Sequence, residues 1–399
     1  MADPRVLVLA PFAPSDGAPH AGGRFLHAWV TGLAERDLRV SLAVPAAARA
    51  QALGRPPAGV HVLGVDVPVP RPGIAGRAGR WLHRSLAGLA PAPGVRRAYA
   101  TSAALAAQLA DAAVLEVQWS EWLPLVAAVR RVRPDLPVAA VVHDVRGRAL
   151  AERAVSASRR SERWSARLAA PRVAAAEARW LSSCDVAWAF AADPLLETVA
   201  PRLGVRLVPP WLELPAAPPG PQPGGPVLFV AAFDRVENVE AARWLVRSVW
   251  PAVRGAHAGA RLVLAGAHPE RVADLAGSDV TLTGYLAELG PLYASAAAVV
   301  APVRGAGGLP FKVPQAMAWA LPVVATTLGA DPVTADRTLF AAVADDPADF
   351  AAGILATLAD PARGRAVGAA AQAWVRAAYD LDAALDAAAA LYRDLAAGN

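Results

Sequence analysis

Short runs of apolar residues alternate along the chain with alanine-rich stretches of helical composition. The first half contains five predicted strands, at 6–10, 40–44, 114–117, 138–142 and 186–189. It also contains predicted helices at 22–35, where a glycine loop runs into the helix, at 122–132, and ending at 177–183. Strands that are apolar throughout suit parallel sheets that helices cover on both faces. The first half is therefore expected to be an α/β domain.

A segment rich in proline and glycine, Pro209–Pro226, then interrupts the alternation. Proline removes backbone donors, so this segment is neither a helix nor a central strand, and we interpret it as a linker. Behind it the pattern restarts, with strands at 227–231, 261–265, 280–283, 298–301 and 322–325. Helices are expected at 239–250, 289–295 and 313–320.

The whole pattern predicts two Rossmann-like domains whose parallel sheets face each other across a cleft. We expect an N-terminal domain at 1–208, the linker at 209–226, a second domain at 227–375, and a C-terminal helix at 376–399 that packs back on the first domain. Ligands of such sheets bind beyond the carboxyl ends of the strands.

Composition excludes several classes of protein. Hydrophobic residues make up 55% of the chain and charged residues 18%, so extensive disorder is not expected. No apolar run reaches membrane-spanning length, and the start lacks the pattern of a secretory signal. The one cysteine, Cys184, excludes an internal disulfide and a cysteine-built zinc site. These features favour a cytoplasmic protein.

Charge is spread unevenly along the chain. Residues 1–224 carry 26 arginines against 17 acidic residues, about +9, whereas residues 225–399 carry about −4. Eleven arginines fall between Arg130 and Arg172. Such a patch attracts an anionic substrate or an anionic membrane surface; the alternative is a solvated helix face on which arginine and glutamate alternate. No nucleic-acid motif or base-stacking aromatic cluster accompanies the arginines, so we expect no nucleic-acid partner.

Lys312 is the only lysine in the chain. It follows a predicted strand and a glycine-rich turn that contains Arg304, Gly307 and Gly308, and it precedes a helix. A compact ammonium group can reach a phosphate through a narrow loop, and glycine-rich turns before helices bind anions. The sequence thus predicts an anion site; the alternatives are that the lysine is there by chance and that Arg304 forms a structural ion pair.

The second half resembles the retaining family-4 glycosyltransferases, which have the two-domain GT-B fold. The sharpest match is RGAGGLPFKVPQAMA, from Arg304 to Ala318, followed by LPVVATTLGAD. The order of LFVAAFDRVENVEAARW, LVLAG and VTLTGY also follows that family. Within the resemblance, Lys312 and Arg304 would neutralise the diphosphate of a nucleotide sugar, and Gln315 would bind its ribose.

The resemblance implies a hexosyltransferase-like enzyme of polysaccharide or natural-product biosynthesis that works with retention of anomeric configuration. The donor would be a UDP- or GDP-type sugar, and the acceptor a carbohydrate, a lipid-linked or a small molecule. The leaving phosphate itself takes the acceptor proton on the usual proposal, so no protein nucleophile, metal or cofactor is expected. If the arginines bind an anionic membrane surface, the enzyme would be peripheral at the inner membrane face.

Gln315 departs from the family, which usually has glutamate there. The widespread motif also has a second glutamate, where this chain has Gly307; the branch with the glycine-rich turn shares that difference. A carboxylate accepts two hydrogen bonds from a ribose diol, whereas an amide offers one acceptor and one donor. We therefore expect Gln315→Glu to preserve or raise donor affinity. The alternatives are a helix residue bonded to the backbone, and a catalytically silent relative that binds a nucleotide sugar or supports a partner enzyme.

The remaining candidates follow predicted strand ends. By the resemblance, His143 would touch the donor sugar; the alternative is a histidine that caps the next helix, which is the role expected of Asp144. Asn238 would cap the helix that begins at Val239. Gly22 and Gly23 would form a loop at the phosphate or acceptor, with a simple turn as the alternative. Gly284 and Tyr285 would wall the nucleobase, with a core tyrosine as the alternative. Acceptor-side candidates are Glu116, Trp119 and Trp122.

Overall fold

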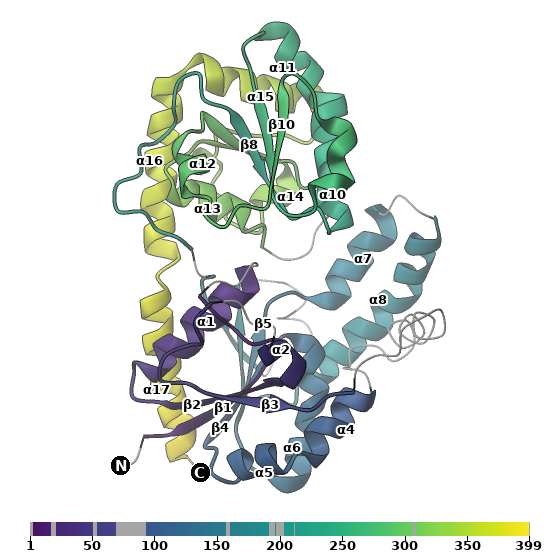
Figure 1. Ribbon diagram of the computed structural model, residues 1–399, viewed down its shortest axis with the longest axis vertical. Helices are drawn as coiled ribbons and strands as arrows, with labels where there is room; N and C mark the ends of the chain where they lie inside the picture. Colours follow the sequence, from purple (N-terminus) through teal and green to yellow (C-terminus); the bar gives the residue numbers. More distant parts are fainter. Residues whose placement is uncertain are drawn as a thin grey trace. The chain divides into compact units, whose positions relative to one another are not determined.

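The computed structural model describes residues 3–16, 21–50, 54–68, 93–156, 160–190, 196, 203–210, 212–305 and 309–398. The chain divides into two compact units (Figure 1). Unit 1 comprises Met1–Trp211 together with Asp380–Asn399, and unit 2 comprises Leu212–Tyr379. The chain therefore passes from one unit to the other twice.

Unit 1 is built on a seven-stranded sheet with the order β3-β2-β1-β4-β5-β6-β7. Its strands are β1 (Arg5–Leu9), β2 (Arg39–Pro45), β3 (His61–Val65), β4 (Val114–Gln118), β5 (Val138–Val142), β6 (Val186–Ala189) and β7 (Gly204–Leu207). Every described pairing is parallel. The central strands β4, β5 and β6 are buried along their whole length, as their continuous apolar runs require.

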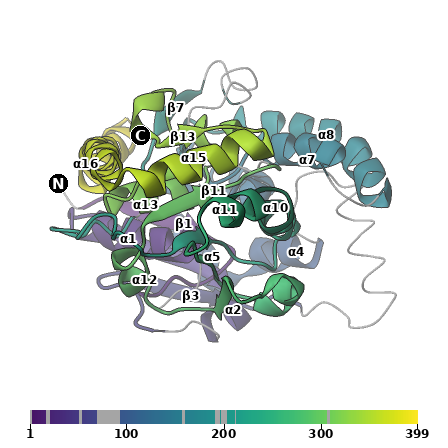
Figure 2. The same cartoon turned by 90° about the horizontal axis from the view of Figure 1, so that it is seen from above.

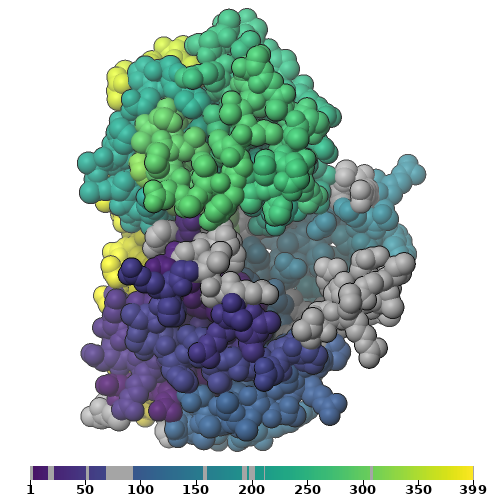
Figure 3. Space-filling model, viewed as in Figure 1, coloured from purple at the N-terminus to yellow at the C-terminus, as the bar shows by residue number. Residues whose placement is uncertain are grey.

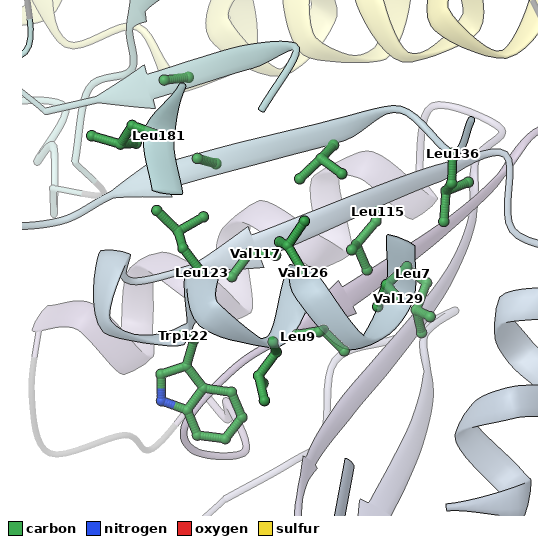
Figure 4. Packing of buried hydrophobic residues seen from close by; sticks show 14 of the residues in the cluster. Leu7, Leu9, Leu115, Val117, Trp122, Leu123, Val126, Val129, Leu136 and Leu181 are labelled. Carbon is green, nitrogen blue, oxygen red and sulfur yellow. The ribbon is translucent and has the colours of Figure 1, made fainter. Parts of the chain in front are cut away.

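Helices cover this sheet and close its core. They are α1 (Ala21–Ala34), α2 (Ala46–Ala50), α4 (Pro93–Thr101), α5 (Ala103–Ala110), the 3-10 helix η1 (Ser120–Leu125), α6 (Val126–Val132), α7 (Arg146–Ser156), α8 (Arg160–Leu181) and α17 (Leu381–Ala397). Figure 4 shows part of the core, where Leu115 and Val117 of β4 meet Leu123, Val126 and Val129.

Unit 2 repeats the design with a six-stranded parallel sheet of order β10-β9-β8-β11-β12-β13. Its strands are β8 (Val227–Val230), β9 (Leu262–Ala265), β10 (Val280–Gly284), β11 (Ala298–Ala301), β12 (Val323–Ala325) and β13 (Ala342–Val343). Two parallel sheets covered by helices confirm the predicted fold class.

The helical elements of unit 2 are mostly short. They are α10 (Val236–Trp244), the π-helical turn η2 (Leu245–Val249), α11 (Trp250–Ala256), the 3-10 helix η3 (Pro269–Leu275), α12 (Gly290–Ala294), α13 (Lys312–Ala318), α14 (Thr327–Ala330), the 3-10 helix η4 (Arg337–Leu339), α15 (Pro347–Ala359) and α16 (Pro361–Ala378). Figure 2 shows α15 and α16 from above. The predicted helix at 239–250 is thus a helix, a π turn and a second helix.

The predicted linker at 209–226 is not a separate segment. The unit boundary falls between Trp211 and Leu212, and the rest of the segment belongs to unit 2. There the Gln222 amide donates to the Ala296 carbonyl at 2.7 Å, and the Ala297 amide donates to the Pro226 carbonyl at 2.9 Å. Its proline-rich chain is held by backbone bonds rather than by an element of its own.

The last helix, α17, belongs to unit 1. Arg36 of α1 pairs with Asp382 at 3.0 Å and with Asp386 at 2.6 Å. Leu385, Ala388, Ala389 and Tyr392 are the buried face of this helix. A methyl group at Gly32 would lie 2.3 Å from Leu385 Cδ1, so the missing side chain lets α17 approach α1 closely.

Candidate functional site

In each unit some of the candidate residues follow strands at or beside the point where the strand order reverses. This place lies between β1 and β4 in unit 1, and between β8 and β11 in unit 2. Loops that leave neighbouring parallel strands in opposite directions open a crevice there, which is where such sheets bind ligands. Lys312 and Asn238 follow β11 and β8, whereas His143 and Trp119 follow β5 and β4.

Lys312 is the first residue of α13, as the sequence predicted. Its Nζ lies 4.7 Å from the centroid of the buried Phe229 ring and donates to Asn238 Oδ1 at 3.2 Å. No carboxylate of the described chain lies within salt-bridge distance of this half-buried ammonium group. Burial, with a smaller contribution from Arg235 and an opposing one from Glu237, lowers the pKa of Lys312 to about 7. A dianionic ligand would restore its charge.

Asn238 was expected to be a helix cap, and that expectation is wrong. It is the third residue of α10, and its Nδ2 donates to the Ala232 carbonyl at 2.8 Å while its Oδ1 accepts from Lys312. Asn238 thus ties the loop after β8 to the start of α13. Nothing in the spacing of the sequence announces this pair, which is separated by 74 positions.

Arg304 is exposed, and its guanidinium lies over the Trp244 ring, 4.9 Å from the centroid. In the described part of the chain no carboxylate pairs with it, so the alternative of a structural ion pair finds no support. Stacking on an aromatic face leaves the guanidinium edges open to an anion. Gly307 and Gly308, which were expected to let the backbone approach a phosphate, lie outside the described residues.

The Gln315 side chain is bonded to the backbone of Glu213. Its Nε2 donates to the Glu213 carbonyl at 2.9 Å, and its Oε1 accepts from the Glu213 amide at 3.3 Å. An amide matches a backbone donor and acceptor together, which a carboxylate cannot do. This pairing gives glutamine a role of its own at a position where the family resemblance implied a ribose ligand.

Gly284 is the last residue of β10, and Tyr285 follows it. Gly284 has φ +71°, a conformation that favours glycine, and Tyr285 is half exposed rather than part of the core. An exposed aromatic ring at a strand's carboxyl end is available for stacking, so the position suits the expected contact with a nucleobase.

His143 follows β5 and is nearly buried among aromatic rings. Its imidazole stacks on the Trp119 indole with centroids 3.6 Å apart, and Phe25 and Phe190 meet it edge-on. Nε2 lies 2.7 Å from Gln118 Oε1. Because the Gln118 amide group donates to Glu116 at 2.6 Å, its oxygen faces the histidine, and Nε2 carries the proton.

Glu116 was expected on the acceptor side, and its burial contradicts that expectation. The side chain is fully buried and accepts hydrogen bonds from Trp29, Gln118 and Tyr392. Burial raises the pKa of this carboxyl, although the three donors oppose the shift. Glu116 therefore joins α1, β4 and α17 rather than touching a substrate.

The two tryptophan candidates of this region differ. Trp119 has φ +66°, a strained backbone for a large residue, and this conformation places its partly exposed ring on His143. Trp122, which is labelled in Figure 4, lies in the hydrophobic core. It meets Tyr99 edge-on, so the acceptor role expected for it is corrected. Its helical spacing from Val126 and Val129 was the signal for a core position.

Gly22 and Gly23 were expected in a loop, but they are the second and third residues of α1. At the start of the helix after β5, the amides of Arg146 and Gly147, in the first turn of α7, donate to the buried Glu177 of α8. This partner at the start of α7 was not expected from the sequence.

The described residues contain no group of three or more His, Cys, Asp or Glu side chains that could hold a metal ion. Within the same residues, no helix is long and apolar enough to cross a bilayer.

Residues 225–360 match the family model of the glycosyl transferases group 1. Several solved structures resemble the whole chain at low sequence identity. Sucrose-phosphate synthase from Thermosynechococcus elongatus has a TM-score of 0.68 and 18% identity, covering 99% of this chain and 100% of that one. No curated protein sequence is significantly similar to this chain.

Two further structures extend the likeness. The α,α-trehalose-phosphate synthase (UDP-forming) from Burkholderia vietnamiensis has a TM-score of 0.64 and 15% identity, covering 99% of each chain. Anabaena HepE in complex with UDP and glucose has a TM-score of 0.59 and 14% identity, covering 97% of this chain and 98% of that one. The GT-B fold and the resemblance to the group 1 glycosyltransferases are thereby confirmed.

Proposed function

We propose that this chain, whose residues 225–360 form a group 1 glycosyltransferase domain, moves a sugar from a nucleotide donor to an acceptor hydroxyl with retention of configuration. The observation that carries the proposal is Lys312. The only lysine of the chain stands half-buried after β11, held by the amide of Asn238 and matched by no described carboxylate. An ammonium group placed in this way has no anionic partner among the described residues.

The chemistry needs such a group. Breaking the anomeric bond of a nucleotide sugar builds negative charge on the departing diphosphate, and preorganised cations that neutralise it lower the barrier. Lys312 would supply a point charge at short range, and Arg304, stacked on Trp244, would supply a second. Diphosphate binding would raise the pKa of Lys312 from about 7, so the bound ligand would keep the ammonium group protonated.

A UDP sugar is the donor that the likenesses favour. The trehalose-phosphate synthase is described as UDP-forming, and HepE was solved with UDP-glucose; a GDP sugar is the second choice. Retention would follow the family's usual course, in which the leaving phosphate takes the acceptor proton. His143 would contact the sugar through Nδ1 as an acceptor during transfer, while the hydrogen bond from its Nε2–H to Gln118 holds the ring.

The first experiment incubates the protein with UDP-glucose, other UDP sugars and GDP sugars, and measures release of the nucleoside diphosphate with and without candidate acceptors. We expect release from one class of donor, and NMR of the product should show the donor's anomeric configuration. Inverted product would contradict retention. Tight binding of UDP with no release, for every donor and acceptor tried, would favour the silent relative that the Gln315 substitution suggests.

Lys312→Ala tests the site itself. Loss of a hydrogen bond to a charged group should weaken UDP binding by roughly 1.5–3 kcal/mol and leave uridine binding nearly unchanged. Arg365→Ala, which removes an exposed charge on α16, serves as the control and should change neither. Isothermal titration with UDP, UMP and uridine measures the difference. Equal losses for UDP and uridine in a folded protein would rule out the diphosphate role.

A further inference from the structure

The helix α8 has two unlike long faces. Ala166, Ala170 and Val173 are buried against the rest of unit 1. At about 100° per residue, Trp164 and Leu168 lie on the opposite side of the same helix. They are 61% and 41% exposed, and Trp164 is the one exposed tryptophan of the described chain. Exposing an apolar side chain of this size to water is unfavourable, so its position on the surface calls for an explanation.

Arginines flank this apolar row on both sides. We define the outer face of α8 as Arg160, Trp164, Arg167, Leu168, Arg172 and Arg179. None of its four arginines pairs with a carboxylate of the described residues. Glu162, near the start of the helix, lies 3.6 Å from Arg153 of α7. The outer face is therefore cationic, and no carboxylate of the described residues neutralises its charge.

The neighbouring helix adds a third exposed apolar group. Val155, at the end of α7, is 78% exposed. The two helices run side by side in Figures 1 and 2, and they reach the surface at the right of the view in Figure 3. Val155 and Trp164 stand near the same end of this pair, before and after the short segment that joins the helices.

We propose that the outer face of α8, together with Val155, docks on an anionic lipid surface. A helix that lies in a membrane interface shows a polar face rich in arginine or lysine and carries tryptophan or leucine toward the lipid. Tryptophan prefers the level of the headgroups, and unpaired arginines attract anionic lipid. A nucleic-acid surface would not need the row of Trp164 and Leu168 between the arginines. The inference deepens the proposed function by placing the acceptor at a membrane, and its test needs no sugar transfer.

The experiment is sedimentation of the full chain with vesicles of phosphatidylcholine alone, or mixed in equal parts with phosphatidylglycerol. We expect binding to the mixed vesicles at low salt and loss of binding at high salt, because exposed charges are screened beyond about 8 Å at physiological ionic strength. Replacing Arg160, Arg167 and Arg172 with glutamine should weaken binding on the order of fivefold for each arginine. Trp164→Gln should weaken it on the order of tenfold.

Matched control variants distinguish binding through the outer face of α8 from binding through the overall charge of the protein. Replacing Arg96, Arg97 and Arg131 with glutamine removes three exposed charges from other helices of unit 1 and should have little effect. Val132→Gln, at a 67% exposed position, is the control for Trp164→Gln. Equal weakening by the control triple, equal binding to neutral vesicles, or no sedimentation at low salt would overturn the proposal. So would binding of oligonucleotides, but not vesicles, through the same arginines. Circular dichroism confirms that each variant is folded, and nucleotide release is measured separately, so loss of docking and loss of activity remain distinct results.

Discussion

The surroundings of Lys312 favour the neutral amine over the charged ammonium group. The ammonium group lies over the Phe229 ring and, within the described chain, donates to the amide oxygen of Asn238, so burial favours its neutral form. An arginine would stay charged at any accessible pH and would need room for a planar fork. A chain that uses arginine at 38 of its 39 basic positions therefore keeps lysine where charge can respond to a ligand.

This environment predicts how donor binding depends on pH. With a pKa of about 7, Lys312 loses its proton as the pH rises above neutral, and UDP affinity should fall by up to about tenfold per unit in that range. Lys312→Arg keeps the charge and should flatten the profile, even if it binds more weakly. Titrations with UDP between pH 7 and the onset of unfolding measure both slopes. The same slope in both proteins would assign the dependence to another group.

Gln118 should decide the tautomer of His143. Its oxygen accepts from Nε2–H, and its own amide group is committed to Glu116. Removing the acceptor in Gln118→Leu should let a population with the proton on Nδ1 appear, and should lower kcat more than it raises KM. Histidine-selective nitrogen-15 NMR reports the tautomer directly. Ser120→Ala, whose hydroxyl bonds Glu177 instead, is the control and should leave the His143 signals in place.

At the scale of elements, α13 is fastened to the chain that enters unit 2. Gln315 on the helix and the backbone of Glu213 exchange two hydrogen bonds over 102 positions. The glutamine that looked like a weakened ribose ligand thereby fixes the helix that carries Lys312. A glutamate at this place would lose one bond and set a carboxylate against a carbonyl oxygen.

We therefore expect Gln315→Glu to lower the free energy of unfolding by about 1 kcal/mol, the usual value of one hydrogen bond. Thermal unfolding measures this change in the free energy of unfolding. Gln222→Glu is the comparison variant, because the Gln222 side chain donates one hydrogen bond to the nearby Gly220 carbonyl. UDP titration decides the functional question left by the sequence. Unchanged stability with tighter UDP binding would show that residue 315 is a ribose ligand and that its bond to Glu213 is dispensable.

For the whole molecule, the sequence predicted the elements that a local pattern of apolar residues determines. The strands at 138–142, 186–189 and 298–301 are confirmed with unchanged bounds, since each is a continuous apolar run inside a parallel sheet. The strands β3, β7 and β13 went unpredicted because each is a short, partly exposed outer strand with little apolar signal. The roles of Glu116, Asn238 and Gln315 depend on partners 74 to 276 positions away, which no local pattern contains.

Unit 1 should depend on the last helix for its stability. Tyr392→Phe removes a donor to the buried Glu116 and should lower the free energy of unfolding by roughly 1–3 kcal/mol. Deleting residues 380–399 also removes both acidic partners of Arg36 and the buried face of α17. Calorimetry should show the transition of unit 1 shifted and that of unit 2 retained. Tyr285→Phe, on a half-exposed ring, is the control, and an equal shift in that variant would contradict the role of Tyr392.

The double passage of the chain between the units also sets an order of events during synthesis. A ribosome releases residues 212–379 as one continuous stretch, and with them the complete unit 2. The earlier-made unit 1 must wait for its twenty closing residues, 380–399. Nascent domains generally fold in order from the N-terminus, but here the half that is made first is completed last. Until then Glu116 lacks the Tyr392 hydroxyl, and the surface that the buried face of α17 will cover stays accessible to chaperones.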